Sequence, residues 1–138
     1  MKSLSAMSFA LLVSVCLNAA AFAGDSNKCR QELARSNYFA SLSSPHDGIR
    51  NSAIFMLMQY RLRYPDDDYA PFAKRLREMS LNDPYPKNRL YAFIVWTLLE
   101  NTDMMKTAAA PPRSEDAKDA YFAQLHELIQ NHQVLAQK

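Results

Sequence analysis

Glycine is scarce in this sequence, with only Gly24 and Gly48 among 138 residues. No segment alternates polar and apolar residues, and this lack excludes a typical half-buried β-sheet. Apolar residues instead recur at helical spacing between short clusters of Pro, Asp, Asn and Ser. The sequence therefore predicts an all-α protein.

The first 23 residues have the pattern of a secretory signal peptide. Lys2 supplies a positive start, residues 9–17 form an apolar stretch, and Ala21-Phe22-Ala23 matches a small-x-small cleavage site. The apolar stretch is shorter than the ~20 residues that a membrane-spanning helix needs. We expect cleavage after Ala23, export to the periplasm or beyond, and a single mature domain of 138 − 23 = 115 residues at 24–138.

Cysteine is also scarce, with two residues in the whole chain. Cys16 lies in the predicted signal peptide, and Val15 precedes it where a lipoprotein signal requires a small residue, so we expect no lipidation. Cys29 then has no partner in the mature chain. It can form an intermolecular or mixed disulfide or stay a free thiol. We favour a buried free thiol, because free cysteine packs as a small hydrophobic residue.

Neither sign of charge is in large excess. The chain has 16 basic and 14 acidic residues, and loss of Lys2 leaves 15 − 14 = +1. This balance gives no electrostatic sign of nucleic-acid binding or of strong attraction to anionic lipid.

The apolar periodicity predicts five helices, near residues 29–42, 48–63, 68–80, 87–101 and 114–136. A linker is expected at 102–113, with residues 104–113 as its mobile part. Ser114 is the expected N-cap of the last helix, and the acidic residues that follow suit its positive end. One stripe of this helix is expected to face the core: Tyr121, Leu125, Leu128, His132 and Leu135.

Two segments align without a gap at an offset of 39 residues, LSSPHDGIRNSAIFMLMQY and LNDPYPKNRLYAFIVWTLL. Residues that are identical at corresponding positions include Leu42 and Leu81, Pro45 and Pro84, Arg50 and Arg89, and Ala53 and Ala92. A fixed period of this length is typical of stacked helical repeats. The prolines prevent the preceding helix from continuing, so each copy is expected to form a tight reversal before an apolar helix.

The stretch from Asp83 to Arg89, DPYPKNR, resembles the D-P-x-P-x-V-R turn that opens the second helix of HEAT repeats. Ser44 to Arg50 is a looser copy, and the likeness covers about residues 29–101. Asn88 and Ser44 depart from the family pattern, and the last helix fits no repeat. The resemblance implies a stack in which the turn arginines bridge neighbouring repeats.

Together these observations predict a short HEAT-like stack of two helical hairpins, at about 29–63 and 68–101, closed by the amphipathic helix 114–136. The residues expected to hold the repeats together are Pro45, Arg50, Pro84, Pro86 and Arg89. An apolar helix such as 87–101 must be covered on more than one side, which places it in the middle of the stack.

No catalytic or metal-binding pattern stands out. The histidines His46, His126 and His132 form no H-E-x-x-H motif, and His132 is expected at the edge of the core. The run Asp66 to Asp68 lacks the spacing of a calcium loop and is expected to cap the third helix. We expect neither enzyme activity nor a cofactor.

Five basic residues lie close in sequence on two successive helices, and two tyrosines flank the second of these helices. They suit an acidic partner or an anionic glycan, or they form a solvated face with pairs such as Lys74 and Glu78. The candidate partner-binding residues are Arg61, Arg63, Tyr64, Lys74, Arg75, Arg77 and Tyr85.

The sequence favours a non-catalytic protein-binding module, monomeric or dimeric, because HEAT-like stacks serve as interaction surfaces. Within this class, a compact exported protein suits an inhibitor or immunity protein directed at an exported toxin or hydrolase. One alternative is a general envelope scaffold. Another is a small-ligand or glycan-binding protein that uses the tyrosines Tyr60, Tyr64, Tyr69 and Tyr85.

Overall fold

The computed structural model describes residues 26–136, and no strand occurs in that range. The described residues fall into two units that divide between residues 37 and 38. Residues 26–42 are helical. Cys29, in the first unit, is an exposed free thiol, so the prediction that it is buried is wrong. It lies in a polar stretch of the sequence near the start of this helix. The predicted signal peptide lies outside the described residues.

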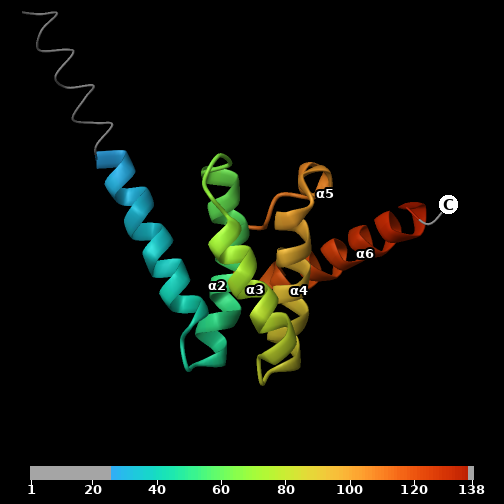
Figure 1. Cartoon of the computed structure of the whole chain (residues 1–138). Helices are drawn as coiled ribbons and strands as arrows, with labels where there is room; N and C mark the ends of the chain where they lie inside the picture. Colours follow the sequence, from blue (N-terminus) through green and yellow to red (C-terminus); the bar gives the residue numbers. More distant parts are fainter. Residues whose placement is uncertain (1–25, 137–138) are drawn as a thin grey trace, which may run out of the picture. The chain divides into compact units, whose positions relative to one another are not determined.

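The second unit is built from helices, and the all-α prediction is confirmed for the part of the chain that the structure describes. These helices are α2 (Asp47–Arg63), α3 (Ala70–Asn82), α4 (Pro86–Glu100), α5 (Thr102–Thr107), the 3-10 helix η1 (Glu115–Ala117) and α6 (Lys118–Ala136). In Figure 1, α2, α3 and α4 stand side by side, and α6 extends past α4.

The helix starts follow local sequence chemistry. Pro86 is the first residue of α4, a position where its missing N–H costs nothing. Ser114 Oγ accepts a hydrogen bond from the amide of Asp116 and so caps η1. It was predicted to cap the last helix, which instead begins at Lys118. α3 begins two residues later than predicted, and Asp68 Oδ1 accepts from the amide of Ala70 at 3.0 Å.

α4 is the central helix of the second unit, because it contacts α2, α3, α5 and α6. Tyr91, Ala92, Ile94, Val95 and Leu98 of this helix are all buried. The all-round apolar character of α4 is explained by these several neighbours.

The predicted linker is partly helical, since α5 occupies residues 102–107 and buries Met104. Its remainder is held by two hydrogen bonds: Tyr121 Oη donates to the carbonyl of Ala109 at 3.0 Å, and Gln59 Nε2 donates to that of Pro112 at 3.0 Å. The order of this segment was not predicted, because residues 102–113 lack a long apolar stripe.

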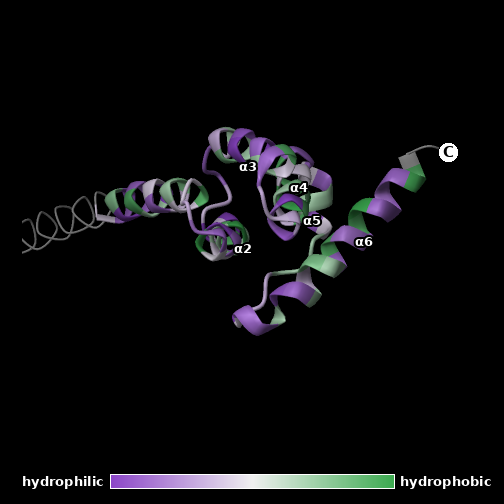
Figure 2. Cartoon of the chain, turned by 90° about the horizontal axis from the view of Figure 1, so that it is seen from below, coloured by the Kyte–Doolittle hydropathy of each residue, from purple (hydrophilic) through white to green (hydrophobic). Residues whose placement is uncertain are grey.

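α6 packs through a stripe that agrees only in part with the predicted one, since Tyr121 and Leu125 are buried as expected. Tyr121, Phe122, Leu125 and Ile129 are buried, whereas His132 is exposed and Leu135 is 70% exposed. The prediction for His132 and Leu135 is wrong, because α6 contacts the core only along its first three turns. Figure 2 shows that hydrophobic segments continue to the C-terminal end of α6, where the helix has left its neighbours.

α6 covers the side of α4 that carries Tyr91. The rings of Tyr91 and Phe122 stack with centroids 3.7 Å apart, and Phe122 also contacts Phe55 of α2. α6 therefore rests on both α2 and α4, and the predicted closure of a repeat stack by this helix is not confirmed.

No helix of residues 26–136 combines the length and the apolar character that a membrane crossing requires.

Candidate protein-binding surfaces

The basic residues at the end of α2 are turned toward the connection between α2 and α3. The Arg61 guanidinium donates to the carbonyl oxygen of Pro65 and lies over the Tyr69 ring, with 4.8 Å between guanidinium carbon and ring centroid. Arg63 is exposed and lies over Tyr64 at 5.7 Å. Arg63 is thus the more accessible of these two arginines.

The basic residues of α3 point to two sides of the helix. Lys74 and Arg77 line a surface cavity of about 540 Å³ together with Glu100 of α4. Arg75 lines a different cavity, where its Nη2 donates to the carbonyl of Leu42 at 3.2 Å. The expected pair of Lys74 with Glu78 does not form, because Glu78 pairs with Arg75 at 3.4 Å.

The seven candidate partner-binding residues therefore do not form one patch. Tyr64 precedes α3 and Tyr85 follows it, so the 13 residues of this helix separate them by about 20 Å. Tyr60 and Tyr69 are buried, and the four tyrosines provide no shared exposed platform. A binding role for any of these residues stays a prediction.

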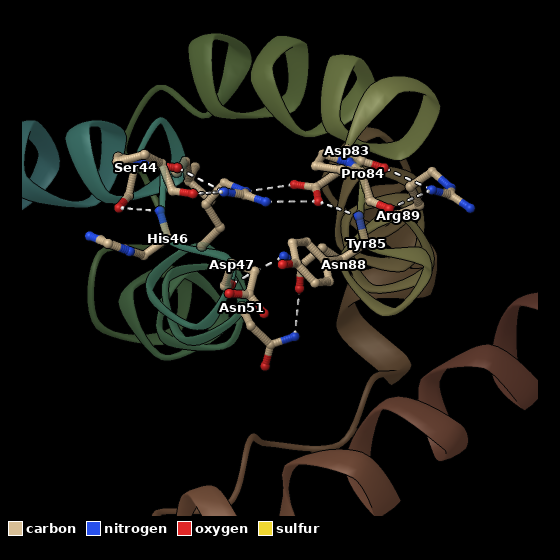
Figure 3. A network of polar contacts seen from close by, with 12 residues as sticks. Ser44, His46, Asp47, Asn51, Asp83, Pro84, Tyr85, Asn88 and Arg89 are labelled. Carbon is tan, nitrogen blue, oxygen red and sulfur yellow. Dashed lines mark hydrogen bonds and ion pairs between the residues drawn. The ribbon is translucent and has the colours of Figure 1, made fainter.

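Arg50 connects the two proline-containing turns of the second unit. Its Nε donates to Asp83 Oδ2 at 2.7 Å and its Nη2 to Asp83 Oδ1 at 3.0 Å, while Nη1 donates to the carbonyl of Ser44 at 2.9 Å. Both side chains of the ion pair are buried, with 7% and 2% exposure. Figure 3 shows Asp83 in the turn that precedes α4, on the opposite side of this network from Ser44.

The two turns make corresponding hydrogen bonds at positions 39 residues apart. Arg89 Nη1 donates to the carbonyl of Asp83 at 2.8 Å, as Arg50 does to Ser44. The side chain of Ser44 accepts from the amide of His46, and that of Asp83 accepts from the amide of Tyr85. The sequence repeat is thus accompanied by a repeated set of contacts.

The position of Asn88 explains its departure from an aliphatic residue. Its Nδ2 donates to the carbonyl of Asp47 at 3.1 Å, and its Oδ1 accepts from Asn51 Nδ2 at 2.8 Å. Asn88 is buried, and these bonds satisfy its amide while they join α2 to α4.

Burial acts to raise the pKa of Asp83, but the hydrogen bonds from Arg50 and from the Tyr85 amide outweigh it and lower this pKa below 3.8. The same hydrogen bond raises the pKa of Arg50. The pair is therefore ionised at neutral pH. A buried, fully bonded pair of this kind positions helices and is poorly accessible to a partner.

An apolar groove runs along one side of α2. It has a volume of about 360 Å³ and is lined by Tyr38, Ser41, Gly48, Ile49, Ser52, Ala53 and Met56. Ile49 is 47% exposed and Met56 is 38% exposed. A Cβ atom at Gly48 would meet no atom within 4 Å, so the groove is open above this glycine. This surface was not predicted, although the apolar residues on several sides of α2 are a sequence signal for it.

Ser52, which lines this groove, is hydrogen-bonded to Glu115 of η1, the short helix that precedes α6. Ser52 Oγ donates to Glu115 Oε1 at 2.5 Å, and Lys118 donates to the same oxygen at 3.1 Å. These two hydrogen bonds lower the pKa of Glu115. The carboxylate thus acts as a contact between α2 and η1.

The titratable groups between α4 and α6 also serve packing. Asp119 accepts from Lys87 at 2.7 Å and from Tyr91 at 2.6 Å, and both bonds lower its pKa. Burial and the bond to Asp119 raise the pKa of Tyr91, and burial raises the pKa of Tyr121 to about 12. Both tyrosines stay neutral over the physiological range.

Within residues 26–136, no three His, Cys, Asp or Glu side chains lie together in a way that could hold a metal ion.

Comparison with family models, curated proteins and solved structures finds no significant match to this chain. The resemblance to HEAT repeats rests on the residues quoted above and stays a prediction.

Proposed function

We propose that this chain is an exported, non-catalytic protein-binding module. The observation that supports the proposal is the apolar groove of α2, where Ile49 and Met56 are exposed beside an open glycine position. Exposed apolar side chains around a groove are typical of sites that accept an amphipathic helix or an apolar loop of another protein.

Within this class we favour an inhibitor or immunity protein that neutralises an envelope-acting toxin or hydrolase. The predicted signal peptide places such a protein in the compartment where its target acts. A compact helical unit that presents a groove suits occlusion of an exported enzyme. A general envelope scaffold would use the same groove without blocking a target's activity.

Gly48 allows a sharp test of the groove. Its φ is not positive and a side chain there meets no atom, so Gly48→Leu is expected to fold normally and to fill the groove. Gly48→Ala is the matched control, because a methyl group leaves most of the groove open.

The mature protein, from Gly24 onward, serves as bait against envelope and secreted fractions, with mass spectrometry of the retained proteins. We expect one stoichiometric exported protein that is retained by the natural sequence and by Gly48→Ala and lost with Gly48→Leu. For an inhibitor, the retained protein is an enzyme or toxin whose activity falls on addition of the bait. Recovery of no protein at ~10 µM bait would contradict the proposal.

A further inference from the structure

α4 carries a second surface that the described helices leave partly open, with the Arg77 guanidinium of α3 lying over the Trp96 ring at 5.6 Å from its centroid. Arg89, Phe93, Trp96 and Glu100 follow one another at i, i+4, i+7 and i+11, so they lie on one face of the helix. None of the four is buried, whereas Tyr91, Ile94 and Leu98 on other faces are. We refer to these four residues as the α4 outer stripe.

The middle of the α4 outer stripe is aromatic. The rings of Phe93 and Trp96 contact each other edge to face, with centroids 6.0 Å apart and planes inclined at 68°. The neighbouring Leu90 is 43% exposed. Aromatic residues that are partly exposed, as these two are, often form the centre of protein interfaces.

Arg89, at one end of the stripe, has unused hydrogen-bonding capacity. Its Nη1 donates to the carbonyl of Asp83, but its Nε and Nη2 have no partner among residues 26–136. Figure 3 shows the Arg89 guanidinium on the far side of the Asp83–Pro84 turn from α2.

Arg50, at the corresponding position of the first turn, shows what these two atoms bind. Its Nε and Nη2 hold both oxygens of the Asp83 carboxylate, at 2.7 and 3.0 Å. A guanidinium that presents the same two donors is suited to a second carboxylate.

A carboxylate lies at the other end of the same stripe. Glu100 is exposed and makes no ion pair within the described part of the chain. The three intervals along the stripe are four, three and four residues, so the spacing is the same when read from either end. An antiparallel copy of α4 would therefore place Arg89 opposite Glu100 and Phe93 opposite Trp96.

We propose that the α4 outer stripe binds a second copy of this chain, as an antiparallel pair of α4 helices about a two-fold axis. Such an interface is isologous, so each Arg89–Glu100 contact occurs twice and the four aromatic rings meet at its centre. A second copy is the binding partner that we favour for this surface, because its Arg89 and Glu100 would each meet the opposite charge. This dimer uses a different side of the second unit's helices from the α2 groove and goes beyond the proposed partner binding.

One helical stripe buries less area than a standard protein interface of roughly 800 Å² per partner. We therefore expect a reversible dimer with a dissociation constant on the order of 10 µM. The paired charges lie at the rim, so we expect this dissociation constant to rise as salt increases.

The test is sedimentation equilibrium of the mature chain over ~1 µM to ~1 mM, with reductant present so that Cys29 cannot link two chains. Trp96 is the only tryptophan, so its fluorescence emission reports directly on the proposed contact. We expect the mass to approach that of a dimer and the emission to shift to shorter wavelength as concentration rises.

Charge reversal identifies the surface. Glu100→Arg is expected to weaken the dimer at least roughly tenfold, and the double variant Arg89→Glu with Glu100→Arg is expected to restore it. Glu127→Arg, an exposed position on α6, is the matched control and should leave dimerisation unchanged. Circular dichroism checks that each variant is folded.

A chain that stays monomeric throughout the concentration range would overturn the proposal. A dimer whose dissociation constant is the same in Glu100→Arg and in the natural sequence would also overturn it, because the contact would then lie elsewhere.

Discussion

At the scale of single residues, Asp83 occupies the position that Ser44 has in the first turn. Each of the two side chains accepts a hydrogen bond from the backbone amide two residues later in the chain. Only the carboxylate of Asp83 also forms an ion pair with the buried Arg50. Asp83 therefore joins the two turns through its ion pair with Arg50, whereas the side chain of Ser44 makes contacts only within the first turn.

Asp83→Ala should therefore destabilise the protein strongly. The change leaves the Arg50 guanidinium buried without its counter-ion, and we expect a loss of about 3–5 kcal/mol in the free energy of unfolding. Ser44→Ala removes only a local bond and should cost less than about 1 kcal/mol. Urea unfolding of the two variants measures both values, and similar losses would show that the ion pair does not hold the turns together.

The lowered pKa of Asp83 predicts a pH dependence. Below about pH 4 the unfolded chain binds a proton at this residue before the folded protein does, so the contribution of the ionised pair is lost as pH falls. The difference in unfolding free energy between the natural sequence and Asp83→Asn should have its maximum value at about pH 5–7 and should decrease as the pH falls below this range. A difference that is constant from about pH 7 to pH 3 would refute this role.

At the scale of elements, α6 is attached by its first three turns. Phe122 is 1% exposed and stacks on Tyr91, whereas Leu135 at the other end is largely exposed. The apolar residues beyond Ile129 thus contribute little to the core, although the sequence pattern includes them.

Phe122→Ala should lower the free energy of unfolding by about 3 kcal/mol, because it removes a large buried ring between α2, α4 and α6. Leu135→Ala should change it by less than about 0.5 kcal/mol. Thermal or urea unfolding provides the comparison. If Leu135→Ala lowered the free energy of unfolding more than Phe122→Ala did, the result would contradict the observed packing of α6 and support the predicted stripe.

At the scale of the whole molecule, the first 23 residues are predicted to direct export and then to be removed. Intact mass measurement of the protein from the envelope or secreted fraction should give a chain that begins at Gly24. Ala23→Asp, which places a charge at the cleavage site, should leave the longer precursor. A mature protein that retains residues 1–23 would rule out cleavage at this site.

The sequence was sufficient for most helices of the second unit because their signals are local. Apolar spacing placed α2 and α4 within one residue at each end, and Pro86 marked the start of α4. α5 was missed because six residues are too few for periodicity to be recognised. The candidate surfaces were predicted less well: the basic residues were identified by closeness along the chain, which does not show which side of a helix each one occupies.

The sequence by itself determined the all-α class, the proline turns and the apolar helices, because φ restriction and helical periodicity act between near neighbours. Only the tertiary structure decided that Arg50 reaches Asp83 and that α6 covers the Tyr91 side of α4. It also decided that Ile49 and Met56 stay exposed and that the α4 outer stripe stays partly exposed. These features depend on residues that are distant in sequence. Their energies come from burial and from paired charges, which exist only once the helices have packed.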